Sequence, residues 1–93
     1  MHLTDHSRIA VIKDQVSCDL GGEAAILNLA NGVYYGLDSV GARVWNLIKE
    51  PMTFAELRET LLAEYDVDVG RLDADLRDLL ARLAEQGLVV ITT

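Results

Sequence analysis

The stretch "NGVYYGLDSVGARVW" (Asn31–Trp45) decides the fold, because it places a tight turn, a strand and a helix start side by side. Asn31 and Gly32 form a strong hairpin signal, since a type I′ turn needs positive φ at both central residues. "VYYGL" (Val33–Leu37) is predicted to be the strand after that turn, and an amphipathic helix follows it. The stretch contains no cysteine, histidine or glutamate, so it offers no obvious catalytic group.

Two further strands are predicted before this stretch. "VSCDL" (Val16–Leu20) and "AAILNL" (Ala24–Leu29) are short apolar runs separated by turn residues. Both faces of the resulting sheet are partly apolar, so we expect something to cover its second face or its edge. A two-residue turn predicts that Ala30 faces Val33, that Asn28 faces Tyr35 and that Ile26 faces Leu37.

The second half of the chain has helical periodicity, and a leucine stripe marks its last helix. The apolar run at residues 88–91 is predicted to be a short terminal strand or an extended tail. Three helices are predicted: one with a cap at Asp38 or Ser39 that ends before Pro51, one from the capping box Thr53–Glu56 to about Glu64, and one from about Arg71 to Gln86.

Composition restricts the class of protein. A chain of 93 residues, 51% of them hydrophobic, predicts a single domain over residues 1–93. The net charge of −7 disfavours nucleic-acid binding, which needs clustered lysine and arginine. The longest uncharged run, Ala24–Leu37, is too short and too polar to span a bilayer. With no signal-peptide pattern and Cys18 as the single cysteine, we expect a cytoplasmic protein without an internal disulfide.

A short sheet, three helices and a final extended piece form the layout of a winged helix-turn-helix. The runs "ANGVYYGLDSVGARVWNLI", "TFAELRETLLAEYDVD" and "LDADLRDLLARLAEQGLV" resemble the PqqD-like family over about Val16–Val90. The resemblance implies an α+β winged helix-turn-helix, with an N-terminal three-stranded antiparallel sheet followed by three helices. It also implies a RiPP recognition element, a domain that binds the leader of a ribosomally synthesised precursor peptide and presents the core to a modifying enzyme.

Within the family, a free-standing chain of this size is most similar to the small recognition component of lasso-peptide biosynthesis. The partners implied are the precursor leader peptide and a leader peptidase of cysteine-protease type, or another modifying enzyme. The alternative is a peptide chaperone of pyrroloquinoline quinone biosynthesis, which serves a radical enzyme. No catalytic residue, cofactor or metal is expected, and no membrane or nucleic-acid partner.

The candidate binding site follows from the edge strand. The strand Val33–Leu37 carries no lysine, proline or inward charge, so an extended peptide can add to it through backbone hydrogen bonds. The resemblance places the leader antiparallel to this strand and against the third helix, although the sequence leaves open which face of the strand meets it. The candidate peptide-binding residues are Val33, Tyr34, Tyr35, Gly36 and Leu37 on the strand, and Asp73, Leu76, Arg77 and Leu80 on the helix.

Simpler interpretations compete for several of these residues. Leu72, Leu79 and Leu83 are expected in the core, whereas Leu76 and Leu80 suit either the core or the floor of a groove. Trp45 is expected in the core, and Cys18 as a small buried apolar residue. His2 and His6 lie in a terminus expected to be mobile and lack further metal ligands. Two other functions stay open, a winged-helix DNA-binding module and a dimerisation module that uses the open edge.

Overall fold

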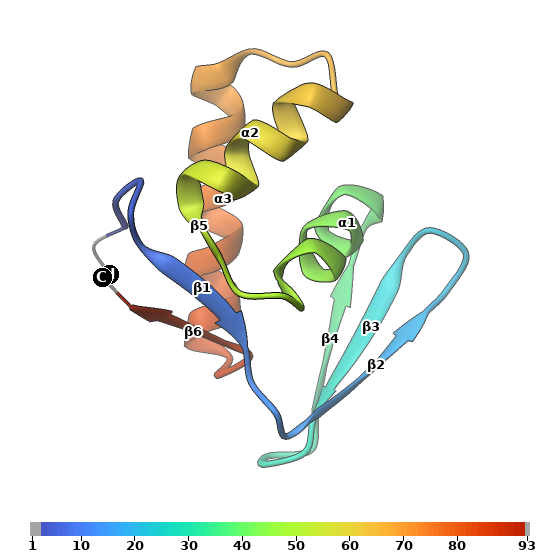
Figure 1. Cartoon of the computed structure of the whole chain (residues 1–93). Helices are drawn as coiled ribbons and strands as arrows, with labels where there is room; N and C mark the ends of the chain where they lie inside the picture. The colour runs from blue at the N-terminus through green and yellow to red at the C-terminus, as the bar shows by residue number, and fades with distance from the viewer. Residues whose placement is uncertain (1–2, 93) are drawn as a thin grey trace.

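The computed structural model describes residues 3–92. These residues form two small sheets and three helices, and Figure 1 shows how they are arranged. The β2–β3–β4 and β5–β1–β6 sheets are both antiparallel. The elements in chain order are β1 (Arg8–Val11), β2 (Gln15–Asp19), β3 (Ala24–Asn28), β4 (Val33–Leu37), α1 (Ser39–Ile48), β5 (Met52–Thr53), α2 (Phe54–Glu64), α3 (Val69–Glu85) and β6 (Val89–Thr92).

The predicted three-stranded antiparallel sheet and three helices are confirmed, and the fold is α+β. The second sheet was not predicted. Its central strand β1 pairs with β5 and β6, which lie far away in the sequence. Because β5 has only two residues, it has no periodicity from which a strand could be predicted. No helix within residues 3–92 is long and apolar enough to cross a membrane.

The predicted register of the β3–β4 hairpin was wrong by two residues. Asn28 pairs with Val33, so the loop between the strands has four residues instead of two. Of the residues in this loop only Gly32 has a positive φ, at 71°, whereas a type I′ turn needs two. The Asn28 side chain shapes the loop, since its Oδ1 accepts from the Ala30 N–H at 2.9 Å. A shift of two residues leaves each side chain on its predicted face.

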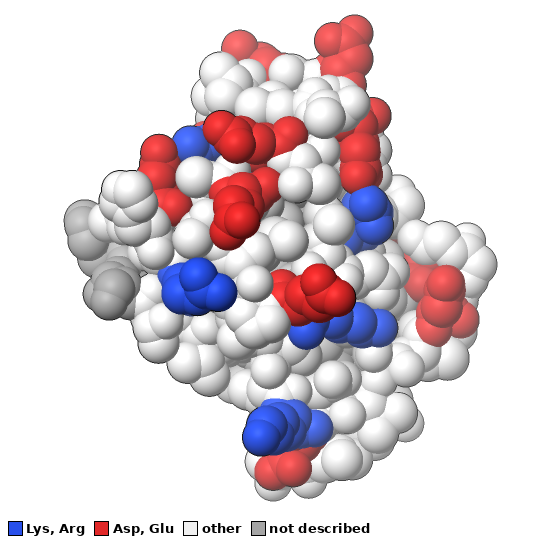
Figure 2. All heavy atoms as spheres, viewed as in Figure 1, with Lys and Arg blue, Asp and Glu red and all other residues white. Residues whose placement is uncertain are grey.

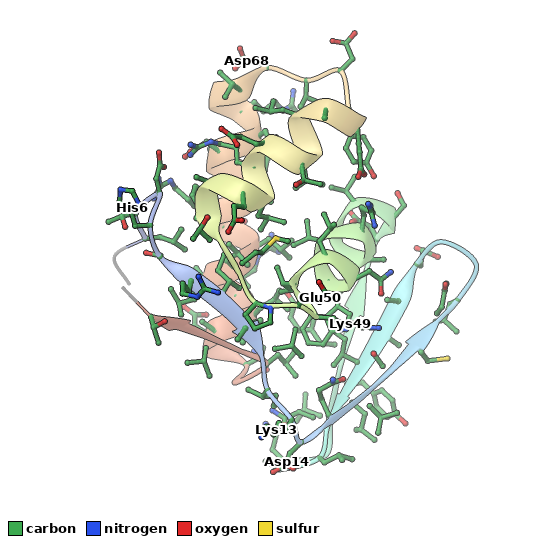
Figure 3. All side chains as sticks on the ribbon, viewed as in Figure 1. His6, Lys13, Asp14, Lys49, Glu50 and Asp68 are labelled. Atoms are coloured by element: carbon green, nitrogen blue, oxygen red, sulfur yellow. The ribbon has the colours of Figure 1, made fainter. Side chains whose placement is uncertain are left out.

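Each helix begins directly after its capping residue. The Asp38 side chain accepts from the Gly41 N–H at 2.8 Å and begins α1. Thr53 and Glu56 form both bonds of the predicted capping box of α2. Asp68, labelled at the start of α3 in Figure 3, caps that helix, which begins at Val69, two residues before the prediction.

The core lies between the three helices and the inner faces of both sheets, and it includes Ile9 of β1 and Val89 of β6. Ile26 and Leu37 of the sheet are buried, and so are Trp45 of α1 and Leu83 of α3, as predicted. Leu72 is also buried, but Leu79 is only partly buried. The core therefore uses most of the leucine stripe of α3 and leaves one edge of that stripe less covered.

The N-terminal segment, expected to be mobile, is packed against the helices. Leu3 is 6% exposed, and Ser7 is completely buried. The carbonyl oxygens of Asp5 and Ser7 accept from the first two N–H groups of α2, at 3.1 and 2.8 Å. His6 is exposed on this segment (Figure 3), and His2 lies outside the described residues.

Candidate functional site

A groove runs between β4 and the face of α3 that carries Leu72 and Leu76, with a cavity volume of about 420 Å³. The start of α1 and the connection between α2 and α3 close its upper end, where Val40 and Val67 are exposed apolar residues. The residues that line the groove are Tyr35, Gly36, Leu37, Asp38, Val40, Gly41, Val44, Tyr65, Val67, Arg71, Leu72, Asp75, Leu76, Asp78, Leu79 and Arg82. Its lining is mainly apolar, with charged side chains along α3.

One wall of the groove is an edge strand, because β4 is the last strand of the β2–β3–β4 sheet. The direction of its backbone groups follows from the β2–β3 ladder. There the Leu20 N–H donates to the Glu23 oxygen at 2.8 Å, and the Leu29 N–H donates to the Asp14 oxygen at 3.0 Å. Since hydrogen-bonded pairs alternate in an antiparallel ladder, odd-numbered residues of β3 bond to β2, and even-numbered ones bond to β4.

The register places Val33, Tyr35 and Leu37 opposite the even-numbered residues of β3. These three residues therefore turn their N–H and C=O groups toward β3. Tyr34 and Gly36 turn theirs outward, where no strand of the described chain pairs with β4. The edge thus offers two donors and two acceptors, the pattern that an added strand needs.

Side chains of β4 alternate between the groove and the outer face of the sheet. Tyr35 is half-buried and Leu37 is 6% exposed, and both line the groove. Tyr34 is 71% exposed on the outer face, and Val33 is exposed at the start of the strand, outside the groove lining. A Cβ added at Gly36 would meet nothing within 4 Å. The structure thereby decides which face of β4 points into the groove, a question that the sequence left open.

Gly41 has a packing role at the upper end of the groove. A Cβ there would lie 3.1 Å from Leu37 Cδ2 and 3.2 Å from Asp38 Oδ1. The missing side chain allows Leu37 to pack against the first turn of α1. A side chain at position 41 would therefore crowd Leu37, the last residue of β4.

The predicted helix residues divide between three environments. Leu76 lines the groove, whereas Leu80 is completely buried in the core. Asp73 and Arg77, which were predicted to bind the peptide, do not line the groove. They face α2 and the N-terminal segment, where they bond to Arg58 and to the Leu3 oxygen. The groove instead uses Leu72 and Leu79, which had been predicted as core.

The charged side chains of α3 along the groove are arranged as ion pairs. Arg82 Nη2 lies 2.7 Å from Asp78 Oδ2, and Arg71 Nε lies 3.9 Å from Asp75 Oδ2. All four side chains are more than half exposed. Exposed pairs of this kind contribute about 0–1 kcal/mol to stability. Because each arginine is matched by an aspartate, this part of the rim is close to neutral in charge.

On the other side of α3, arginines lower the pKa of Asp73 below its ordinary value near 3.8. The hydrogen bond from Arg77 is the largest cause, and Arg58 adds a second bond. Arg58 likewise lowers the pKa of Asp5 through its side-chain hydrogen bonds. These carboxylates are therefore held in their ionised form.

The groove presents an open strand edge and an apolar helix face. Its lining contains no cysteine or histidine, and within residues 3–92 no group of three or more potential metal ligands comes together. Cys18, predicted to be buried, is instead exposed on β2 and is not among the residues that line the groove. The arrangement of an open strand edge over an apolar helix face suits an extended polypeptide.

Comparison with known proteins agrees with this geometry. Residues 23–89 match the family described as coenzyme PQQ synthesis protein D, PqqD. The chain belongs to the PqqD family. The match confirms the PqqD-like resemblance found in the sequence, and it includes β3, β4 and all three helices, so both walls of the groove lie within the family region. No curated protein sequence matches the chain.

Two solved structures resemble this PqqD-family chain. The first is TbiB1 in complex with the TbiA(beta) leader peptide, which is 38% identical, with a TM-score of 0.81 over 86% of this chain and 93% of that one. The second is a lasso peptide synthetase B1 complexed with the leader peptide, at 18% identity, with a TM-score of 0.77 over 88% and 96% of the two chains. The second likeness supports the fold alone.

Proposed function

We propose that this protein binds the leader segment of a ribosomally synthesised precursor peptide, by adding the leader as a strand to the edge of β4 over α3. One observation carries the proposal, namely that an unpaired strand edge and an apolar helix face border the same groove. The likeness to TbiB1, whose structure contains a leader peptide, supports the same class of ligand.

The alternating directions of the backbone groups and side chains along β4 define how the peptide lies. An antiparallel peptide exchanges hydrogen bonds with the backbones of Tyr34 and Gly36. Its residues opposite Tyr35 and Leu37 then point inward, because side chains on directly paired residues share a face of the sheet. These inward residues meet Leu76 and its apolar neighbours on α3. The leader therefore carries apolar side chains at two positions separated by one residue.

Most of the affinity comes from these inward side chains. Burying apolar surface contributes roughly 25 cal/mol per Å², and a fully buried leucine-sized side chain contributes roughly 1.5–3 kcal/mol. The exposed pairs Arg71–Asp75 and Arg82–Asp78 contribute about 0–1 kcal/mol each, so they add little to the affinity. Affinity should accordingly depend little on salt.

The protein acts as a recognition component of lasso-peptide biosynthesis and performs no chemistry itself. It presents the core peptide to a leader peptidase of cysteine-protease type or to another modifying enzyme. A peptide chaperone of the pyrroloquinoline quinone type, serving a radical enzyme, is the alternative within the family. We interpret the three helices and the flanking strands as a winged helix-turn-helix adapted to peptides.

Charge distribution favours a peptide over DNA. The exposed arginines of α3 each face an aspartate one turn away. Figure 2 shows acidic side chains gathered over the upper half of the molecule around α2, with single basic residues between them. A helix that reads DNA needs unpaired basic residues facing the phosphates.

Amide hydrogen exchange tests the proposal with an internal control. On addition of the TbiA(beta) leader peptide or the native precursor, the Tyr34 and Gly36 amides should exchange more slowly. The amides of Ser17 and Asp19, which by the same alternation face the other free edge of the sheet, should not change. Tight binding with unchanged exchange at Tyr34 and Gly36 would rule out strand addition.

A further inference from the structure

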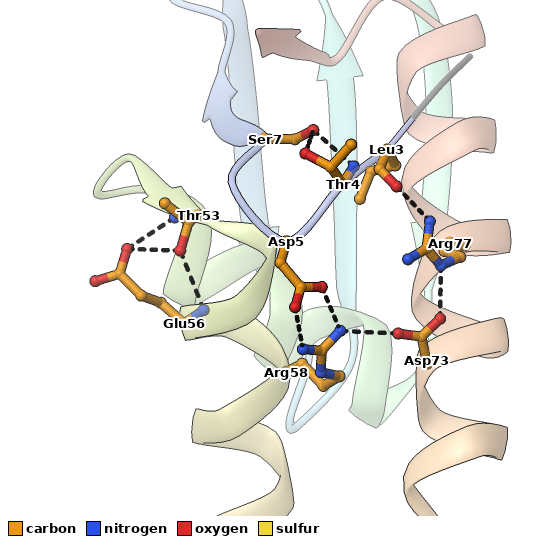
Figure 4. A network of polar contacts seen from close by, with 9 residues as sticks. All are labelled: Leu3, Thr4, Asp5, Ser7, Thr53, Glu56, Arg58, Asp73 and Arg77. Atoms are coloured by element: carbon orange, nitrogen blue, oxygen red, sulfur yellow. Dashed lines mark hydrogen bonds and ion pairs between the residues drawn. The ribbon is translucent and has the colours of Figure 1, made fainter. Parts of the chain in front are cut away.

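Four charged side chains join three separate parts of the chain on the side of α3 that faces away from the groove. We call this cluster the brace: Asp5, Arg58, Asp73 and Arg77 (Figure 4). Arg58 Nη1 donates to Asp5 Oδ1 and to Asp73 Oδ2, both at 2.9 Å, and its Nη2 donates to Asp5 Oδ2 at 3.1 Å. Arg77 donates to Asp73 Oδ1 and to the Leu3 oxygen, both at 2.5 Å.

The brace differs from the other ion pairs of the protein in its surroundings. The Arg58 side chain is 17% exposed and that of Asp73 is 28% exposed. Both guanidinium groups also lie over the ring of the buried Phe54, with their central carbons 5.3 and 4.8 Å from its centroid. Partly buried, charge-assisted bonds together with cation–π contacts hold their partners in a defined geometry.

The N-terminal end of the brace is fixed to α2 by backbone bonds. The Ala55 N–H donates to the Asp5 oxygen, and the Phe54 N–H donates to the Ser7 oxygen. Asp5 is therefore not on a loose terminus, because its own peptide group caps the first turn of the helix that carries Arg58. Through Asp73, the N-terminal segment and α2 together hold α3 in place.

The brace and the groove share the same two turns of α3. Leu72 and Leu76 line the groove, and the next residues in the sequence, Asp73 and Arg77, belong to the brace. On the groove side, a cavity of about 420 Å³ separates α3 from β4. The contacts on the braced side must therefore contribute to how far these two turns lie from β4.

We propose that Asp5, Arg58, Asp73 and Arg77 are positioning residues, which set the width of the groove by holding α3 from behind. This inference rests on the proposed function, since it concerns the same groove. Loss of the brace lets α3 move relative to β4 while the leucine core keeps the protein folded. Leader affinity then falls, because fewer of the bound peptide's apolar side chains reach the floor of the groove.

The test uses two brace variants, Asp5→Asn and Asp73→Asn, and one matched control. Glu64→Gln removes the same charge and an ion pair of similar geometry, in which Glu64 accepts from Arg43 at 2.8 and 2.6 Å. That pair joins α1 to α2 and does not involve α3. The Asp5 side chain is 53% exposed, so Asp5→Asn keeps the test available if Asp73→Asn does not fold.

The first readout is the width of the groove, and it needs no peptide. Nitroxide labels at Gly36→Cys and Asp75→Cys, in a Cys18→Ser background, flank the groove at positions where added atoms meet open space or solvent. Dipolar electron paramagnetic resonance should show a shifted or broader distance distribution in the brace variants and an unchanged one in Glu64→Gln. All variants are compared at a temperature where circular dichroism shows them folded. A merely stabilising role would lower the melting temperature and leave this distribution unchanged.

The second readout is affinity for the TbiA(beta) leader peptide in unlabelled protein, measured by titration calorimetry. The brace variants should bind roughly fivefold more weakly or worse, and Glu64→Gln should bind like the wild type. If the wild type does not bind this peptide, the proposed function is weakened, and the distance measurement alone decides about the brace. Unchanged distances in the folded brace variants would overturn the inference. Changed distances in the brace variants together with unchanged leader affinity would also overturn the inference.

Discussion

Two neighbouring leucines of α3 allow the groove to be tested separately from the core. Leu79 lines the groove and is only partly buried, whereas Leu80 is completely buried and lies outside the groove. The same substitution, Leu→Ala, removes the same atoms from the same helix at both positions. Leu79→Ala is therefore expected to weaken binding more than stability, and Leu80→Ala to weaken stability more than binding.

The magnitudes follow from where each side chain is buried. Leu80→Ala leaves a cavity in the core, so it should lower the free energy of unfolding by about 2–5 kcal/mol. That is a large part of the roughly 5–15 kcal/mol that stabilises a typical domain. Leu79 buries part of its surface on folding and the rest only when the peptide covers it. Its truncation should cost less stability than that of Leu80, and binding should lose about 1 kcal/mol, or roughly fivefold in affinity.

Urea unfolding and titration calorimetry measure the two quantities independently. Trp45 is 1% exposed and is the single tryptophan of the chain, so its fluorescence reports global unfolding. Binding is measured well below the unfolding transition, where both variants are fully folded. If Leu79→Ala costs as much stability as Leu80→Ala and leaves affinity unchanged, then Leu79 is a core residue and the groove floor has been assigned to the wrong face of α3.

Two further predictions concern acid stability and Cys18. In the folded protein, the pKa values of Asp5 and Asp73 lie below their ordinary value near 3.8. Their ionised forms therefore stabilise the folded protein at higher pH. This stabilisation is lost as the pH falls through the lowered pKa values. As the pH is lowered below about 4, the urea concentration at the unfolding midpoint should therefore decrease, and it should decrease less steeply in Asp73→Asn than in the wild type. Equal pH dependence in the wild type and in Asp73→Asn would contradict the role of this carboxylate. Cys18 is exposed and is not among the residues that line the groove, so Cys18→Ser should leave leader affinity and product formation by the reconstituted pathway near wild type. Lost turnover in a folded variant would argue for a catalytic role.

Local signals in the sequence were sufficient for β4 and for the caps of α1 and α2. Val33–Leu37 is bounded by Gly32 on one side and by the capping residue Asp38 on the other, and both limits of the strand were predicted correctly. The capping box at Thr53 works because its two partners lie three residues apart. Such signals involve neighbours in the chain, which is why the sequence reveals them.

The parts that were missed depend on contacts between distant residues. Asp73 and Arg77, four residues apart on a helix, have the spacing of an ordinary exposed ion pair at a groove rim. Their actual environment is set by Asp5 and Arg58, which lie 53 residues apart in the sequence. The leucine stripe likewise predicted that α3 has an apolar face, but not which edge of that face would be left open beside β4. The second sheet escaped prediction for the same reason, because its pairing is entirely between distant segments.

The two sides of α3 are packed differently, and this difference connects the fold with the proposed function. A helix packed on all sides would leave no room for a peptide, and one held only by the core leucines could close the empty groove by moving toward β4. In this protein, charged and aromatic groups hold α3 on the side away from the groove, where Arg58 and Arg77 stack on Phe54. The groove side can then stay open without further contacts across it. Part of the ordering cost of binding is thereby already met in the unbound protein, which leaves more of the peptide's apolar burial to appear as affinity.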